Sequence, residues 1–158
     1  MSLRRHVALL SIALLLALSA GACSADRTRP TIALSTTTSE DPLQAALATG
    51  EAIYVAQCLT CHGAGDEGEL APSLRDGLTD TFASCKDQAT FVTVGAEDWP
   101  SDTYGDDDTP LGRYPVIMGA SRDVLDPAEV VAVNTWVRVE LAGLDPVATA
   151  ADCGVDGY

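Results

Sequence analysis

The chain has 158 residues, of which 47% are hydrophobic, so it is long enough for one folded domain and unlike a wholly disordered protein. Acidic residues outnumber basic ones by 23 to 9, which gives a net charge of −14. Binding to nucleic acid or to an anionic membrane surface depends on clustered Lys and Arg, so this balance argues against both partners. Aromatic residues are only 5% of the chain, a thin supply of large side chains for a core.

Residues 1–22 have the pattern of an export signal. Two arginines precede an apolar run over residues 7–18, which is too short to span a bilayer. The small residues at 20–22 satisfy the ordinary rule for signal cleavage, and with Cys23 they also resemble the lipobox of bacterial lipoproteins. We therefore expect an exported chain cleaved before Cys23. By the lipobox resemblance, acylation of Cys23 would tether that chain to a membrane in the extracytoplasmic or periplasmic space.

Residues 23–40 are rich in Ser, Thr, Pro and charged residues, a composition typical of a flexible tether. A disordered N-terminus without a spacing role is the alternative. The folded domain is expected over residues 41–153, with residues 154–158 as a C-terminal tail.

The first helix is expected to begin at Asp41-Pro42, an N-cap followed by proline in the first helical position, and to run to about Gln57. Gly50 lies inside this helix, where glycine usually has a packing reason. The core candidates of the helix are Leu43, Leu47, Ile53, Tyr54 and Val55.

Residues 63–82 and 96–115 hold many Gly and Pro residues and are expected to be irregular. A short helix is predicted over residues 86–94, between Ser84 as N-cap and Gly95. The last helix begins at the Asp126 cap and ends near Gly143, and its apolar face holds Val130, Val133, Val137 and Leu141. With no alternating run long enough for a sheet, the fold class is all-α, with about three to four helices.

Cys58-Leu-Thr-Cys61-His62 is a C-x-x-C-H motif. Two thiols at this spacing can bond the two vinyl groups of one haem while the adjacent imidazole reaches the iron. Three other readings are open. A zinc site would need Cys85 and Cys153 as further ligands, a thioredoxin-like redox pair expects a βαβ context, and a short disulfide leaves His62 without a role.

From Gly50 to about Leu141 the chain resembles a class I c-type cytochrome domain. The matching stretches, in the order of that family, are residues 50–54, 58–63, 71–74 and 94–95, and Met118 ahead of a capped helix. The resemblance implies a small helical domain packed around one covalently bound haem c.

By this resemblance, His62 and Met118 are the axial ligands of the haem iron, and the Pro72 carbonyl bonds the other imidazole nitrogen of His62. Gly50 would let the first helix cross closely against Trp136 on the last. From their positions around Pro72 and Met118, further candidate haem contacts are Leu74, Trp99, Tyr104, Tyr114, Val116 and Ile117, with a place in the ordinary core as the alternative for each. Arg75 and Arg113 are candidates to pair with haem propionates.

Three cysteines remain after the two of the motif. If Cys23 is acylated, Cys85 and Cys153 are free to form a disulfide that pins the C-terminal segment beside the 86–94 helix; two free buried thiols are the alternative. The run of acidic residues over 97–108 is expected to be a solvated loop, with a docking patch for a basic redox partner or a calcium loop as the other readings.

The expected function is that of a monohaem c-type cytochrome, an electron-transfer protein and not an enzyme, which carries single electrons between redox proteins at the outer face of a bacterial membrane. A fixed haem subunit of a larger oxidoreductase is one alternative. A haem enzyme or gas sensor is another, if Met118 does not bind the iron.

Overall fold

The computed structural model describes residues 41–65, 70–106 and 108–158, all of which lie in one unit of the chain, Thr38–Tyr158. The predictions of a signal peptide over 1–22, a tether over 23–40 and a lipid on Cys23 lie outside the described residues. Within the described ranges, no helix combines the length and the hydropathy that crossing a bilayer requires.

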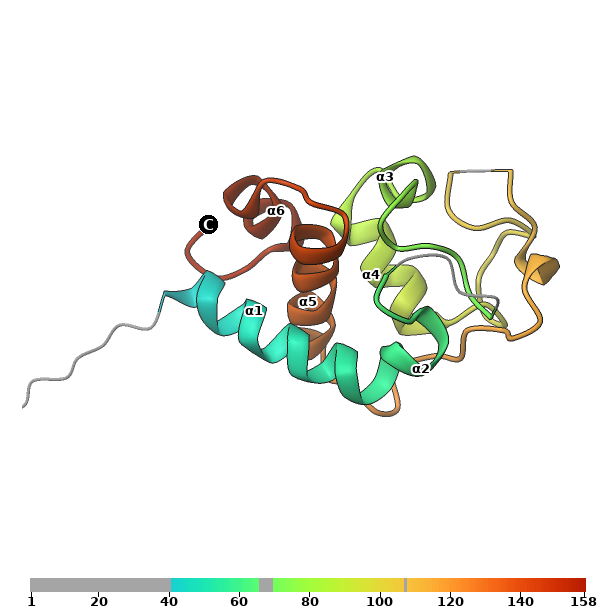
Figure 1. The fold of residues 1–158 in the computed structure, drawn as a ribbon, viewed down its shortest axis with the longest axis horizontal. Helices are drawn as coiled ribbons and strands as arrows, with labels where there is room; N and C mark the ends of the chain where they lie inside the picture. Colours follow the sequence, from blue (N-terminus) through green and yellow to red (C-terminus); the bar gives the residue numbers. More distant parts are fainter. Residues whose placement is uncertain (1–40, 66–69, 107) are drawn as a thin grey trace, which may run out of the picture. The chain divides into compact units, whose positions relative to one another are not determined.

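The structure is built from helices (Figure 1). Helix α1 (Pro42–Ile53) continues through a π-helical turn (Tyr54–Cys58) into α2 (Leu59–His62). Two shorter helices follow, α3 (Leu78–Thr81) and α4 (Cys85–Val94), and then a 3₁₀ turn (Leu111–Arg113). Helix α5 (Pro127–Trp136) runs into a second π-helical turn (Val137–Leu141) and is followed by α6 (Pro146–Cys153). In the part of the chain that is described, extended pairing is limited to one bridge, between Thr103 and Pro110, so the all-α prediction is confirmed.

Side-chain caps start the main helices at the predicted residues. The Asp41 carboxylate accepts from the Leu43 N–H at 3.0 Å, and the Ser84 hydroxyl accepts from the Asp87 N–H. At α5, Asp126 and Glu129 form a reciprocal capping box. These bonds satisfy N–H groups that a helix start otherwise leaves without partners.

Helix α1 crosses α5 at Gly50, as the sequence predicted. A Cβ at Gly50 would lie 2.5 Å from the Trp136 Cβ and would also meet the Ala132 carbonyl oxygen. One turn further along, the Tyr54 ring packs on the Trp136 ring with centroids 4.8 Å apart. The crossing therefore depends on the missing side chain, because any larger residue would push the two helices apart.

The core lies between α1, α4 and the α5 run. Its buried members include three of the four residues predicted for the last helix, Val133, Val137 and Leu141, together with Ile53, Tyr54, Phe82, Phe91 and Tyr104. The fourth, Val130, is also buried but is not part of this cluster. Val55 was predicted in the core but is 57% exposed, because it lies about 100° further around the helix than the buried Tyr54.

Several features differ from the sequence expectation. The first helical run ends at His62 instead of Gln57, so the whole motif is helical. Helix α3 interrupts the stretch expected to be loop, and α6 adds a helix after Gly143. Residues 154–158 lie against α1, where Val155 is buried with Leu43 and the Tyr158 hydroxyl donates to Asp41 at 2.6 Å.

Candidate cofactor site

One cavity of about 800 Å³ opens on the side of the molecule that carries α2, and its size suits a bound cofactor. Its lining is largely apolar and includes every residue proposed from the sequence as a principal haem contact: Cys58, Cys61, His62, Pro72, Leu74, Tyr114 and Met118. Residues up to 60 positions apart in the chain therefore meet at one site. Whether His62 and Met118 bind iron stays a prediction.

The motif reaches the cavity at the end of the first helical run. Cys58 ends the π-helical turn and Cys61 lies one helical turn later, and both thiols are free and partly buried. Gly63 ends the run with φ +58°, a backbone conformation that suits glycine. The Tyr54 hydroxyl donates to the Gly63 carbonyl at 2.9 Å, which ties the end of the run back to its own helix.

His62 is oriented by the backbone of the loop that faces it. Its Nδ1 lies 3.3 Å from the Pro72 carbonyl oxygen, as the resemblance implied, and as the donor it leaves Nε2 as the basic nitrogen. Burial lowers the pKa of His62, and the bond to Pro72 opposes that change. A neutral imidazole with a fixed tautomer is the form that binds a metal.

Pro72 is held in place by bonds to a single carbonyl group. The Gly65 carbonyl oxygen accepts from the Leu74 N–H at 3.0 Å, the Arg75 N–H at 2.9 Å and the Ser73 hydroxyl at 3.1 Å. Because Gly65 follows the motif by only three residues, these bonds fold the segment of Pro72 and Leu74 back over His62.

Met118 reaches the cavity from a segment without helix, and α4 supports that segment. Its carbonyl oxygen accepts from the Ala96 N–H at 2.8 Å. Gly95, with φ +73°, lies so close that a Cβ there would meet the Gly119 carbonyl carbon at 2.7 Å. These two contacts hold the backbone directly after the Met118 side chain.

Burial also affects the titrating groups beside the motif. It raises the pKa of Tyr54 to about 12, and the nearby Cys58 adds to the effect. Burial raises the pKa of Cys58 to about 11, with a further contribution from Cys61. At neutral pH both groups are therefore protonated, and the Cys58 thiol is not a ready nucleophile on its own.

The cavity wall also holds polar residues that the sequence did not mark as site residues. Gln88, Ser121 and Asn134 all line it, and Gln88 and Asn134 are almost fully buried. The Ser121 hydroxyl is buried without a hydrogen-bond partner among the described residues. Buried hydroxyls are normally bonded, so this one indicates a polar group that belongs in the cavity.

Trp99 was a candidate haem contact, and the structure places it elsewhere. Its ring packs edge-on against Phe91 at a centroid distance of 5.2 Å, and its indole N–H donates to the Thr103 carbonyl at 3.1 Å. The Trp99 side chain thus packs against α4 and is not among the residues that line the cavity. The other candidates, Tyr104, Val116 and Ile117, do line it.

The donor set of the cavity fits a haem. It offers two free thiols at the required spacing, an oriented imidazole, a thioether and an unpaired hydroxyl in an apolar surround. Within the described ranges, no three His, Cys, Asp or Glu side chains come close enough to hold a metal ion, so the zinc site considered from the sequence is not assembled there. Cys85 and Cys153 are bonded to each other instead.

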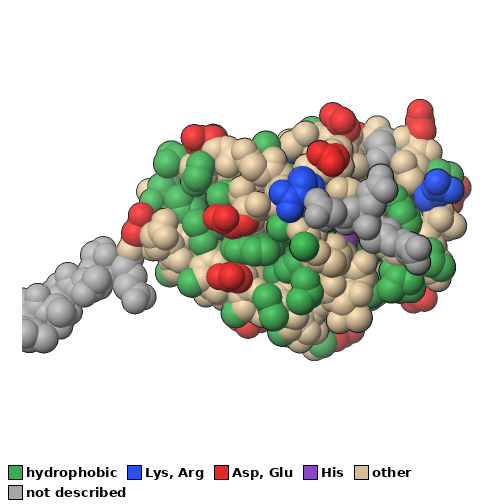
Figure 2. Space-filling view, viewed as in Figure 1, with side chains coloured by type: hydrophobic (Ala, Val, Ile, Leu, Met, Phe, Trp, Pro, Cys, Tyr) green, Lys and Arg blue, Asp and Glu red, His purple; other side chains and the backbone are tan. Residues whose placement is uncertain are grey.

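The cavity rim is apolar within an acidic surface. Four large exposed side chains, Leu70, Val116, Ile117 and Val124, are also part of the cavity lining. Over the face drawn in Figure 2, acidic side chains are widespread and basic ones are sparse. Another protein could therefore approach a group bound in the cavity across this apolar rim.

Residues 45–109 match the family described as cytochrome c oxidase, cbb3-type, subunit III. The chain is also similar to cytochrome c-L of Methylorubrum extorquens AM1, with 26% identity over 92 residues, which cover 58% of this chain and 39% of that relative. The chain thus spans less than half the length of the curated relative that it matches. No solved structure matched significantly.

Proposed function

We propose that this monohaem c-type cytochrome moves single electrons between redox proteins. Its cofactor is covalently bound haem c, and His62 and Met118 are proposed as the axial ligands of the haem iron. The observation that carries the proposal is the meeting of both side chains and both motif thiols in one cavity. When bound, the haem supplies an iron that gains and loses one electron. With His62 and Met118 both bound, the iron would have no open coordination position, which would favour electron transfer over chemistry on a substrate.

The chain's own residues hold and shield the group. Cys58 and Cys61 would anchor it covalently, and the Pro72 carbonyl keeps the His62 ring in its tautomer. The apolar lining, to which Leu74 and Tyr114 contribute, excludes water from the site. A site held by these bonds would change little in shape when the haem gains or loses an electron, and this would favour electron transfer.

The reduced visible spectrum with and without carbon monoxide tests the ligand assignment. The haem-loaded protein should give a low-spin spectrum that does not respond to carbon monoxide. Met118→Ala should open the sixth position and make the spectrum respond, because Met118 is the only thioether near the cavity among the described residues. Val147→Ala, an exposed position in α6 that does not line the cavity, is the control and should behave as the wild type. A wild-type protein that binds carbon monoxide would favour a haem enzyme or gas sensor.

We also propose that the domain works outside the cytoplasm on a lipid tether at Cys23. The signal pattern and the small residues before Cys23 support this. Replacing Cys23 with Ser should release the protein from the membrane fraction after export. Retention of the Cys23→Ser protein in that fraction would contradict the tether.

The partner is proposed to be a redox protein with a basic docking surface around an apolar centre. The excess of acidic residues and the apolar rim of the cavity support this complementarity. Association with a basic redox protein should therefore slow as ionic strength rises. An electron-transfer rate that does not depend on salt would contradict it.

A fixed haem subunit of a larger oxidoreductase is the second candidate. The match to a family described as a subunit of cbb3-type oxidase favours it. Mild detergent extraction of the native membrane separates the two: a stoichiometric complex indicates a subunit, and a protein that migrates alone indicates a mobile carrier.

A further inference from the structure

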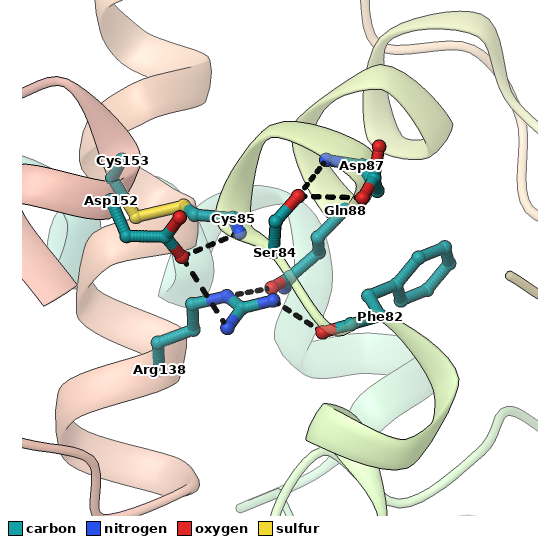
Figure 3. Close-up of polar contacts among 8 residues, drawn as sticks. All are labelled: Phe82, Ser84, Cys85, Asp87, Gln88, Arg138, Asp152 and Cys153. Atoms are coloured by element: carbon teal, nitrogen blue, oxygen red, sulfur yellow. Dashed lines mark hydrogen bonds and ion pairs between the residues drawn. A yellow bond between two sulfur atoms is a disulfide. The ribbon is translucent and has the colours of Figure 1, made fainter. Parts of the chain in front are cut away.

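Arg138 is a charged side chain buried inside the last helical run. It lies in the π-helical turn that continues α5, directly after the core residue Val137, and is only 2% exposed. Arginine is rarely buried to this degree without partners, because removing its charge from water is costly. Its partners come from α4, from α6 and from the residue that follows α3 (Figure 3).

On one side, Arg138 bonds the wall of the cofactor cavity. Its Nε donates to the Gln88 side-chain oxygen at 2.8 Å, and its Nη2 donates to the Phe82 carbonyl oxygen at 2.6 Å. Gln88 and Phe82 both line the cavity, and Gln88 is 4% exposed. The rigid guanidinium plane therefore fixes two wall residues at once.

On the other side, the counter-charge is incomplete. The Asp152 carboxylate lies 3.8 Å from the Arg138 Nη1, and its side chain is 41% exposed. The same carboxylate oxygen accepts from the Cys85 N–H at 2.7 Å, and Cys85 is bonded to Cys153, next in the chain to Asp152. Burial lowers the pKa of Arg138, and the carboxylates of Asp152 and Asp87 oppose this change.

We propose that Arg138 is a positioning and charge-setting residue for the haem site. It holds Gln88 and Phe82 in the cavity wall. Its positive charge, which Asp152 partly compensates, raises the reduction potential of the bound haem. The proposal rests on the proposed function, because it requires a haem in the cavity. It assigns a redox role to a network that lies outside the ligand set.

The sign of the effect follows from charge alone. The oxidised iron carries one positive charge more than the reduced iron, so a nearby cation disfavours oxidation. Loss of the Arg138 charge should lower the midpoint potential, and loss of the Asp152 charge should raise it. A packing defect would not reverse its direction between two partners of the same ion pair, and this separates an electrostatic role from a merely structural one.

The experiment is a spectroelectrochemical titration of the haem-loaded wild type and three variants: Arg138→Gln, Asp152→Asn and Asp156→Asn. At a fixed applied potential, the ratio of reduced to oxidised protein should fall about three- to tenfold in Arg138→Gln and rise by a comparable factor in Asp152→Asn. Asp156 is an exposed carboxylate in the same C-terminal segment without an ion pair to Arg138 in the described structure, so Asp156→Asn controls for the change in net charge.

Opposite shifts in the two ion-pair variants, with little change in the control, support the proposal. Shifts in the same direction, or none beyond the control, overturn it. If Arg138→Gln does not fold, Asp152→Asn against Asp156→Asn still decides, because only the first removes a charge that faces Arg138. Failure of the proposed function is separate, since it would appear first as a wild-type protein without covalent haem.

Discussion

Replacing Gly50 with alanine tests the crossing of α1 and α5. The added Cβ would lie 2.5 Å from the Trp136 Cβ and 2.9 Å from the Ala132 carbonyl carbon, whereas ordinary contact begins at 3.4 Å. Relief of the Trp136 contact alone requires the helices to separate by about 0.9 Å, and the Ala132 carbonyl oxygen lies closer still. Because Ala132 meets the new atom with its backbone, no side-chain rotation relieves the clash.

The expected cost follows from two opposing effects. Overpacking of a core costs roughly 1–3 kcal/mol, and the backbone clash places Gly50→Ala at the upper end of that range. Alanine recovers about 1 kcal/mol through its higher helix propensity. The free energy of unfolding should therefore fall by about 2 kcal/mol, which corresponds to a decrease in Tm of roughly 6–12 °C for a domain of this size.

Thermal unfolding of the haem-loaded protein, followed by far-UV circular dichroism, measures this difference. Gly112→Ala is the matched control, because a Cβ at Gly112 meets nothing within 4 Å and its φ is not positive. A Gly50→Ala variant that unfolds within about 2 °C of this control would refute the close crossing of the helices.

Three further predictions concern the rest of the domain. Burial raises the pKa of Tyr54 to about 12 from an unfolded value near 10, so between these values the folded state keeps a proton that the unfolded state loses. The free energy of unfolding should therefore fall by about 1–2 kcal/mol as pH rises from 10 to 12. Urea unfolding across that range measures this change, and Tyr54→Phe should lose it. Asp126→Ala removes the acceptor of the Glu129 N–H and should lower the free energy of unfolding by about 1 kcal/mol in the same assay; an unchanged value would contradict the capping box. Reduction of the bond between Cys85 and Cys153, which closes a separation of 68 residues, should lower the free energy of unfolding by about 2–4 kcal/mol, and equal denaturant midpoints with and without reductant would argue against the bond.

Local signals made much of this structure predictable. Asp41, Ser84 and Asp126 each place a side-chain acceptor at a helix start, and the structure uses all three. The motif and Met118 could be placed together because the resemblance to class I c-type cytochromes gives each a role at one haem. Gly50 could be paired with Trp136 since the resemblance supplied a reason for a glycine inside a helix.

Helix α6 has a start signal in the sequence, although the helix was not predicted. Asp145-Pro146 repeats the start signature of α1 and α5, and the Asp145 side chain accepts from the Ala148 N–H at 2.8 Å. The helix has only eight residues and is marginal in isolation. Its stability comes from Ala150 in the core and from the bond at Cys153, and neither contribution is visible in a local window.

The polar part of the cavity wall was beyond local reasoning for a different reason. A charged residue next to an apolar face is normally solvated, so nothing in the neighbourhood of Arg138 indicates burial. Its partners Gln88 and Phe82 lie 50 and 56 residues away in the chain. Ser121 likewise becomes notable only when its hydroxyl is found buried without a partner among the described residues.

The π-helical turn at Tyr54–Cys58 sets the rotational phase of the motif. A π-helical turn contains one residue more than a turn of α-helix, so it is equivalent to a one-residue insertion in the helix. Deleting one exposed residue within it, such as Val55, would restore the α-helical period and rotate everything that follows by about 100° around the helix axis. Cys58, Cys61 and His62 would then turn together away from the cavity. The number of residues in the π-helical turn therefore determines the direction in which the motif side chains face, so the site depends on the turn as well as on the motif.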